Sequence, residues 1–186
     1  EEAREADLLL HLVDLSHPLY PGKEEYHLAL DTHFTDELYP QYKRSADTWY
    51  ILQDIRMSSH CGTHIEFPYH HCRTGMDAAA FPLDRLVGDA VLLDFRQKAP
   101  GDAVEKAELE ELGGKIRQGD MLLFNFNCAR FYRTPRSHDR PFITHEAIRW
   151  LALEKKISLI GSDASGIVWA VGSKVKRWKV GDEVVI

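Results

Sequence analysis

Short apolar runs bounded by turn residues predict most of the strands in this chain. The stretch "TWYILQDIRMS" (48–58) alternates apolar and polar positions, which is typical of a strand. The run "AVLLDF" (90–95) is continuously apolar, which favours a buried strand, and "DMLLFNFN" (120–127) indicates another. A further strand is expected at "LLLHLVDLS" (8–16), which ends in the turn signal "HPLYPG", and the last at "ISLIGSD" (157–163).

Two segments show the spacing of an amphipathic helix. In residues 104–112 the apolar side chains lie near one face, and Gly113 is a suitable residue just beyond a helix end. The clearer helix is "ITHEAIRWLALEKK" (143–156), which Thr144 can cap. Its apolar stripe consists of Ala147, Ile148, Leu151 and Ala152. The stretch "YHLALD" (26–31) is too short to assign.

The order of these elements indicates the fold class. Strands dominate the first part of the chain and helices enter later, which favours a mixed α/β protein over strict alternation of strands and helices. We therefore expect an α/β fold with a mixed, largely antiparallel sheet. A chain of 186 residues is long enough for one sizeable core, with or without a short appendage.

Composition and charge narrow the classes of partner. The 44% hydrophobic and 28% charged residues are typical of a globular protein, and the net charge of −6 disfavours nucleic acid. The densest basic stretch, "RFYRTPRSHDRPF" (130–142), is short and interrupted by two prolines. No apolar run approaches the roughly 20 residues that span a bilayer. We expect neither a nucleic-acid partner nor a membrane segment.

The cysteines indicate the redox compartment. Cys61, Cys72 and Cys128 are odd in number and form no C-x-x-C pair. They therefore fit free thiols in a reducing compartment better than a disulfide framework. We expect a cytoplasmic protein.

Residues 58–71, "SSHCGTHIEFPYHH", carry the strongest candidate chemistry. Pro68 and Gly62 exclude a continuous helix through this stretch. In an extended chain, side chains two positions apart share one face. The residues of equal parity that share this face are His60, His64, Glu66 and His70.

The spacing predicts a kinked strand around a metal ion. A fully extended strand would separate His60 from His64 by about 13 Å at the Cα atoms, which is too far for both to bind one ion. Gly62 lies between them, where a bend costs little. Cys61 and His71 have the opposite parity, so Cys61 is expected to point away from the ion and His71 to be exposed or to lie behind the ligands.

The donor types indicate which metal the stretch would bind. Imidazole and carboxylate together favour Zn²⁺ or Mn²⁺ over Ca²⁺ or Mg²⁺. Three protein ligands plus water describe a catalytic site. A second ion fits if Glu66 bridges and His70 binds the other side. The alternative is a polar loop without metal, because ten histidines in 186 residues produce some clustering by chance.

Other side chains could line a substrate pocket. A flat substrate could be walled by Trp49, Tyr50, Phe67 and Tyr69, with core packing as the alternative. A substrate carboxylate could be held by Arg133, Arg136 and Arg140, with a solvated loop as the alternative.

The string "HCGTHIEFPYH" (60–70) resembles the H-x-G-T-H-x-D-x-P-x-H signature of the cyclase family, which includes bacterial-type kynurenine formamidases and isatin hydrolases. Further segments resemble the family on both sides of this motif, so that the likeness covers roughly residues 12–166. These segments are "VDLSHPLYPG", "MDAAAFPLDRLVGDAVLLDF", "GDMLLFNFN" and "ITHEAIRWLALEKKISLIGSDASG".

The resemblance implies a swivelling β/β/α-type fold and a metal-dependent hydrolase of amide bonds. It also implies a small aromatic or cyclic amide substrate and a homo-oligomer whose neighbouring subunits help to wall the site. His60, His64 and Glu66 match the ligands of the first metal, and Glu66 and His70 match the bridging acid and a second-metal or catalytic histidine. Glu66 replaces the usual aspartate and is one methylene longer, which puts the two-metal arrangement in doubt.

The C-terminal stretch departs from the family. "GSDASGIVWAVGSKVKRWKVGDEVVI" (161–186) resembles part of the catalytic domain of medium-chain alcohol dehydrogenases and enoyl reductases. The alternative is a divergent β-rich tail. The sequence contains no G-x-G-x-x-G fingerprint, so neither interpretation implies a site for a nicotinamide cofactor. We expect a cyclase-like domain over residues 1–166 and an atypical tail over 167–186.

The expected function is hydrolysis of an N-formyl-aryl or cyclic amide by metal-activated water. The resemblance implies a further catalytic histidine and a metal-binding glutamate beyond "IGSDA". After Asp163 the sequence has no histidine, and its later acids are Asp182 and Glu183. We therefore expect impaired activity. The alternatives are a non-catalytic metal- or ligand-binding cyclase-like protein and, on the tail alone, an oxidoreductase fragment.

Overall fold

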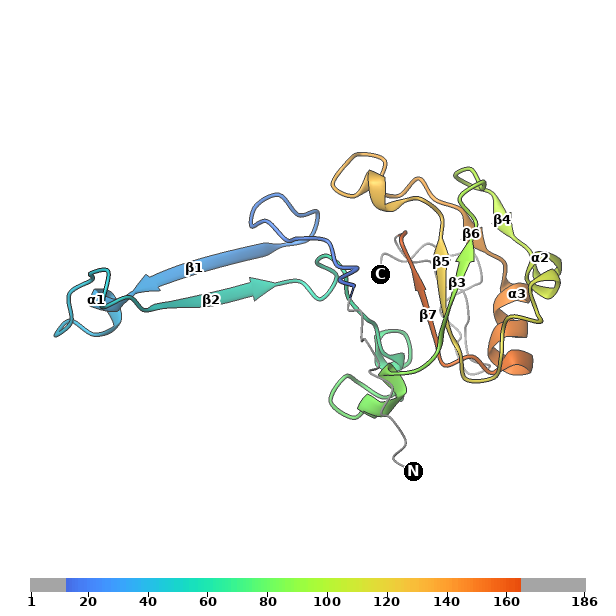
Figure 1. The fold of residues 1–186 in the computed structure, drawn as a ribbon, viewed down its shortest axis with the longest axis horizontal. Helices are drawn as coiled ribbons and strands as arrows, with labels where there is room; N and C mark the ends of the chain where they lie inside the picture. Colours follow the sequence, from blue (N-terminus) through green and yellow to red (C-terminus); the bar gives the residue numbers. More distant parts are fainter. Residues whose placement is uncertain (1–12, 165–186) are drawn as a thin grey trace, which may run out of the picture. The chain divides into compact units, whose positions relative to one another are not determined.

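The computed structural model describes residues 13–164. The chain divides into two compact units, Glu1–His64 and Ile65–Ile186, and the described residues of each are shown in Figure 1. The expected tail, 167–186, lies outside the described residues, so its separation from residues 1–166 stays a prediction. Among the helices of residues 13–164, none has the length and apolar composition of a membrane span.

A β-hairpin forms the regular part of the N-terminal unit. Strand β1 (Leu28–Phe34) pairs antiparallel with β2 (Ile51–Met57), and the short helix α1 (Thr35–Leu38) begins the connection between them. The strand predicted at 48–58 is confirmed, and β1 begins within the unassigned stretch 26–31. At the closed end of the hairpin, the hydroxyl of Thr35 donates to the carbonyl oxygen of Tyr50 and accepts from its N–H, both at 2.8 Å.

The two faces of the hairpin differ in chemistry. Directly paired residues of an antiparallel ladder point to the same face. One face therefore carries the apolar pairs Leu28–Met57, Leu30–Ile55 and Phe34–Ile51. On the other face the side chains of Arg56 and Asp31 form an ion pair, and His33 Nε2 lies 3.1 Å from Asp54 Oδ2. All residues of β2 are exposed, including those of the apolar face.

The strand predicted at 8–16 is absent from residues 13–16, the part of that stretch that the structure describes. Residues 13–16 are irregular, and residues 8–12 lie outside the described range. The carboxylate of Asp14 accepts a hydrogen bond from the N–H of Ser16 at 2.9 Å. Such a local side-chain contact favours a turn over an extended ladder.

The C-terminal unit contains a three-stranded parallel sheet in the order β3–β5–β7 (Figure 1). Its strands are β3 (Ala90–Asp94), β5 (Met121–Asn125) and β7 (Leu159–Ser162). A second, two-stranded parallel pair joins β4 (Ala103–Val104) to β6 (Phe142–Ile143). The helical elements are η1 (Pro68–His70), η2 (Leu83–Leu86), α2 (Lys106–Glu111), η3 (Ala129–Phe131), α3 (His145–Arg149) and the π-helical η4 (Trp150–Lys155).

The mixed α/β class is confirmed, but strand direction differs from the expectation of a largely antiparallel sheet. In residues 13–164, antiparallel pairing is confined to β1 and β2, and the remaining pairs are parallel. Parallel neighbours need a long crossover, and α2 and α3 supply it here. The C-terminal unit therefore alternates strands and helices. We did not expect this alternation, because strands dominate the first part of the sequence.

The core of this unit lies between the sheet and the two helices, which Figure 1 shows on one side of the strands. In β5, Leu122 and Phe124 are buried while their neighbours are half-buried, as the alternation of a strand requires. Three phenylalanine rings pack in series, with centroids 5.8 Å apart for Phe95–Phe124 and 5.9 Å for Phe124–Phe126. The fully buried large side chains are Phe124, Leu109, Leu122, Leu151 and Val104.

The predicted helix at 143–156 forms with a change of geometry. The hydroxyl of Thr144 accepts from the N–H of Ala147 at 3.3 Å, so the predicted cap is present. The helix begins as α3 and continues as η4 until Lys156, whose φ is 51°. Lys155 Nζ donates to the carbonyl oxygens of Gly113 and Ile116, which ties the end of this helix to the segment that follows α2.

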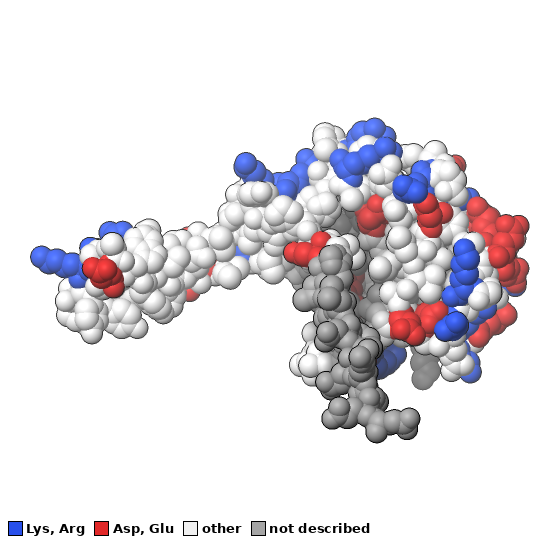
Figure 2. Space-filling model, in the orientation of Figure 1, with Lys and Arg blue, Asp and Glu red and all other residues white. Residues whose placement is uncertain are grey.

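Acidic side chains gather over α2, where Figure 2 shows a group of carboxylates. Two lysines partly neutralise them: Lys98 lies 2.7 Å from Glu108, and Lys106 lies 3.3 Å from Glu110. This surface of the unit is acidic, as is the sequence as a whole. It therefore offers no basic face to which a nucleic acid could bind.

The packing of η4 generates a stability prediction. Leu151 is fully buried, whereas Leu153, two residues later, is 58% exposed. Leu151→Ala should therefore lower the free energy of unfolding by about 2–5 kcal/mol, since it leaves a cavity. Leu153→Ala, the matched control, should change it by less than about 0.5 kcal/mol. Urea denaturation measures both, and equal midpoints for the two variants would contradict this placement of the core.

Candidate metal centre

The loop that follows β2 is bent at Gly62, as the spacing of its histidines predicts. Gly62 has a φ of 70°, a conformation that other residues rarely adopt. A β-carbon at this position would also collide with the side chain of Leu19. Before the bend, the N–H of Ser58 donates to the carbonyl oxygen of His27 at 2.9 Å, and that of Cys61 donates to Ser58 at 3.1 Å. The turn is therefore fixed by hydrogen bonds as well as by the glycine.

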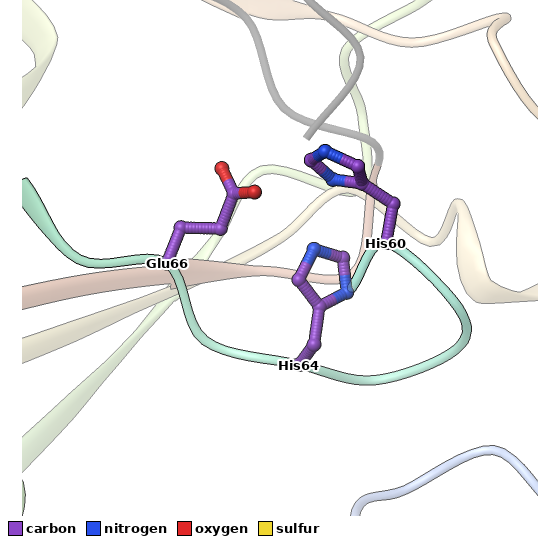
Figure 3. Close-up of side chains that lie close together, drawn as sticks. All are labelled: His60, His64 and Glu66. Carbon is purple, nitrogen blue, oxygen red and sulfur yellow. The ribbon is translucent and has the colours of Figure 1, made fainter. Parts of the chain in front are cut away.

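Three side chains of this loop point toward one another (Figure 3). One donor atom from each of His60, His64 and Glu66 can be chosen so that all lie within 4.8 Å of one another. The rings of His60 and His64 are 5.5 Å apart and nearly perpendicular, at 84°. Two ligands of one ion at about 2.1 Å can be at most about 4.2 Å apart, so small side-chain rotations would complete the site.

His64 is oriented by the bend itself. Its Nδ1 lies 2.7 Å from the carbonyl oxygen of Gly62. A carbonyl oxygen only accepts, so Nδ1 carries the proton and Nε2 is left with its lone pair. Metal-binding histidines are commonly fixed by such a contact from the other ring nitrogen. The donor set and this tautomer therefore fit a divalent metal ion.

His60 is held from its other side by aromatic packing. Its ring lies 5.5 Å from that of Tyr26, and its Nδ1 is buried. The N–H of His60 also lies 3.3 Å from the hydroxyl oxygen of Ser58. The ring of His60 is therefore packed against Tyr26, and its backbone is tied to Ser58.

A second group of donors lies immediately downstream. Donor atoms of Glu66, His70 and His71 also lie within 4.8 Å of one another, and His70 Nε2 is 3.4 Å from Glu66 Oε2. His71, expected to be exposed or to lie behind the ligands, is half-buried and close to Glu66. The 3₁₀ turn η1 replaces the extended chain there, so strand parity no longer applies.

The backbone around η1 is tightly packed. Pro68 begins the turn, where its missing N–H is not needed. Gly75 approaches the backbone of Pro68 so closely that a β-carbon would lie 2.6 Å from the carbonyl carbon of Pro68. Phe67, expected to wall a substrate pocket or to pack, lies against Phe81, with ring centroids 5.0 Å apart and the rings tilted by 55°. Its packing role is thus the observed one.

The arginines expected to hold a substrate carboxylate have contacts of their own. Arg136 lies 2.9 Å from Asp139 and packs over the ring of Phe131, while Arg133 packs over Tyr132. Arg140 is buried and donates to the carbonyl oxygen of His138. The exposed Arg136 fits the alternative of a solvated loop, whereas the buried Arg140 does not.

Asp163 has a structural role that our reading of the sequence did not assign to it. Its carboxylate accepts from the backbone N–H groups of Phe126 at 2.7 Å and Cys128 at 2.8 Å. It thereby joins the segment after β5 to the end of β7. The signal was its place directly after an apolar strand.

The three cysteines are free thiols, as expected. A hydrogen bond from the side chain of Thr74 lowers the pKa of the exposed Cys72. Burial raises the pKa of Cys128. Cys61 is buried, with 4% of its surface exposed, and contributes no donor to either histidine group.

The C-terminal stretch has a relative of another kind. A segment of 28 residues is 89% identical to crotonyl-CoA carboxylase/reductase of Cereibacter sphaeroides, and it amounts to 15% of this chain and 6% of that protein. This match supports the reductase likeness of the tail over a short length only.

Known proteins resemble the larger part of the chain. A kynurenine formamidase of Erythrobacter litoralis is 33% identical over 113 residues, which are 61% of this chain and 49% of that protein. The chain spans about half the length of the curated formamidases it matches.

A solved structure described as a potential metal-dependent hydrolase with cyclase activity superposes with a TM-score of 0.60 and 26% identity, covering 82% of this chain and 67% of that one. The family model named Cyclase matches residues 13–167, which include both histidine groups. This match extends over most of the sequence, and the chain therefore belongs to the cyclase family.

Proposed function

We propose that this chain is a metal-dependent hydrolase that opens the amide bond of an N-formyl-aryl or cyclic amide. The observation that carries the proposal is the convergence of His60, His64 and Glu66 in the bent loop of a cyclase-family chain. The likeness to a kynurenine formamidase and to a potential metal-dependent hydrolase supports the same reaction class.

We assign the binding of a zinc or manganese ion to His60, His64 and Glu66. Two neutral imidazoles and one carboxylate leave part of the ion's charge uncompensated, which is typical of catalytic centres. When bound, such an ion lowers the pKa of water and polarises a carbonyl group. The contact between His64 Nδ1 and the carbonyl oxygen of Gly62 leaves Nε2 as the nitrogen available to the ion.

Hydrolysis adds the hydroxyl of water to the carbonyl carbon, breaks the C–N bond and transfers a proton to the leaving nitrogen. Two roles are open to His70, whose Nε2 is 3.4 Å from the carboxylate of Glu66. It can deliver that proton as a general acid, or it can bind a second ion. Glu66 orients His70 in either role.

A second candidate function is binding without catalysis. The family resemblance implies a catalytic histidine and a metal-binding glutamate beyond "IGSDA", whereas residues 164–186 contain no histidine. Glu66 also stands where the family motif has aspartate. A chain with these departures could retain the first metal and turn over slowly or not at all.

We further propose that the chain acts in the cytoplasm as a homo-oligomer. The apolar face of the hairpin supports self-association, since Ile55 is 63% and Met57 53% exposed. A two-stranded hairpin gains stability when its apolar face packs against another surface. The free thiols support a reducing compartment.

The first prediction from this proposal concerns metal retention. His60→Ala and His64→Ala should each abolish retention of zinc at this centre, because each removes one of three protein ligands. His33→Ala is the matched control, since His33 also faces a carboxylate, Asp54, but stands outside both donor groups. Dialysis followed by elemental analysis measures the effect. Equal retention in all three variants would contradict the assignment.

The second prediction concerns turnover. With added Zn²⁺ or Mn²⁺, hydrolysis of N-formyl-aryl and cyclic imide substrates should be slower than the roughly 1–10³ s⁻¹ of ordinary enzymes. The reason is that residues 164–186 contain no histidine to match the family's distal one, and loss of general acid–base help alone costs about 10²–10⁴-fold.

Steady-state kinetics test this, with His64→Ala as the inactive reference. Turnover in the ordinary range would contradict the expected impairment. Metal retention with turnover no higher than that of His64→Ala would identify the chain as the non-catalytic binder.

A further inference from the structure

A strap formed by residues 17–27, which precede β1, lies against the bent loop (residues 58–64). Both segments belong to the N-terminal unit. At the start of the strap, the backbone N–H of His17 donates to the hydroxyl oxygen of Thr63 at 3.1 Å. Thr63 stands directly before His64 in the sequence. This hydrogen bond therefore ties the backbone next to one of the proposed metal ligands.

The end of the strap lies against the other histidine ligand. The ring of Tyr26 packs on that of His60, with centroids 5.5 Å apart and the rings tilted by 43°. The next residue, His27, accepts from the N–H of Ser58 at 2.9 Å. Between these two ends, the side chain of Leu19 lies against the bend itself. The strap thus contacts the loop before, at and after the bend.

The strap is shaped by its own sequence, "YPGK" (20–23). The N–H of Lys23 donates to the carbonyl oxygen of Tyr20 at 3.0 Å, and Gly22 has a φ of 76°. Proline followed by glycine at the two central positions is typical of a type II turn, which needs a positive φ at the glycine. The N–H of Tyr20 also donates to the carboxylate of Glu24 at 2.6 Å. Because a β-turn reverses the chain, both ends of the strap can reach one loop.

We propose that Thr63 and Tyr26 are positioning residues of the metal centre. Neither supplies a ligand, but through the strap they hold His64 and His60 in the orientation that binds the ion. The inference rests on the proposed metal centre and adds the residues that set its affinity. Ligands that are ordered before binding give a tighter complex, because less conformational entropy is lost when the ion arrives.

Zinc affinity of the full chain, measured by competition with a chromophoric chelator, tests the role of Thr63. Thr63→Val keeps the shape of the side chain and removes the acceptor. It should weaken zinc binding by about 10–100-fold, the range for lost partners of metal ligands. Thr63→Ser keeps the hydroxyl and should restore the affinity.

The hairpin offers a matched control for this substitution. The hydroxyl of Thr32 also accepts one exposed hydrogen bond at 3.1 Å, from the side-chain amide of Gln53. Thr32→Val therefore removes a similar contact from strand β1, outside the loop and the strap, and should leave the zinc affinity unchanged.

The visible spectrum of bound Co²⁺ tests the role of Tyr26, because this spectrum depends on the geometry of the ligands. Tyr26→Leu should change the spectrum and weaken metal binding, whereas Tyr26→Phe keeps the ring and should preserve both. Tyr42→Leu is the control. Tyr42 packs on Tyr39 in the connection between β1 and β2, with centroids 6.3 Å apart, and its loss should leave the spectrum unchanged.

Urea denaturation of the metal-free variants separates positioning from a purely structural role. We expect Thr63→Val and Thr32→Val to have similar midpoints although only the first loses zinc affinity. Unchanged affinity in Thr63→Val and Tyr26→Leu would overturn the inference and leave the metal centre intact. Weaker binding only in variants whose metal-free form is unfolded would overturn it as well. A folded, unsubstituted chain that binds no zinc would overturn both the inference and the proposed metal centre.

Discussion

The left-handed bend at Gly62 is the constraint on which the metal centre depends. With a φ of 70° and the side chain of Leu19 against it, this position admits only glycine without rearrangement. The bend shortens the path between His60 and His64 and offers its own carbonyl oxygen to His64. One backbone feature thus sets both the approach of two ligands and the tautomer of one of them.

Local pattern predicted the elements well because each depends on its own residues. Periodicity placed the ends of β2, β3, β5 and β7 to within three residues, and Thr144 caps its helix as expected. Strand direction could not be read in this way. Whether β3 and β5 run parallel depends on where the intervening helix packs, and periodicity does not specify a partner.

The sequence predicted the part of the candidate site that needs only one bend in an extended chain. It did not predict the part that lies in a helical turn. The intervals among His60, His64 and Glu66 require only a bend at a visible glycine, and the structure shows that bend. The placement of His71 depends on η1, whose first residue, Pro68, signalled a turn without indicating its type. Strand parity does not extend through that proline, so it could not place His71.

The central claim is that the bent loop binds a divalent metal, and anomalous diffraction from crystals grown with Zn²⁺ tests it most directly. We predict an anomalous peak at the zinc edge about 2.0–2.3 Å from one nitrogen of each of His60 and His64 and from an oxygen of Glu66. A fully zinc-soaked crystal without a peak there, or with these side chains more than about 6 Å apart, far beyond the span of one ion's ligands, would contradict it.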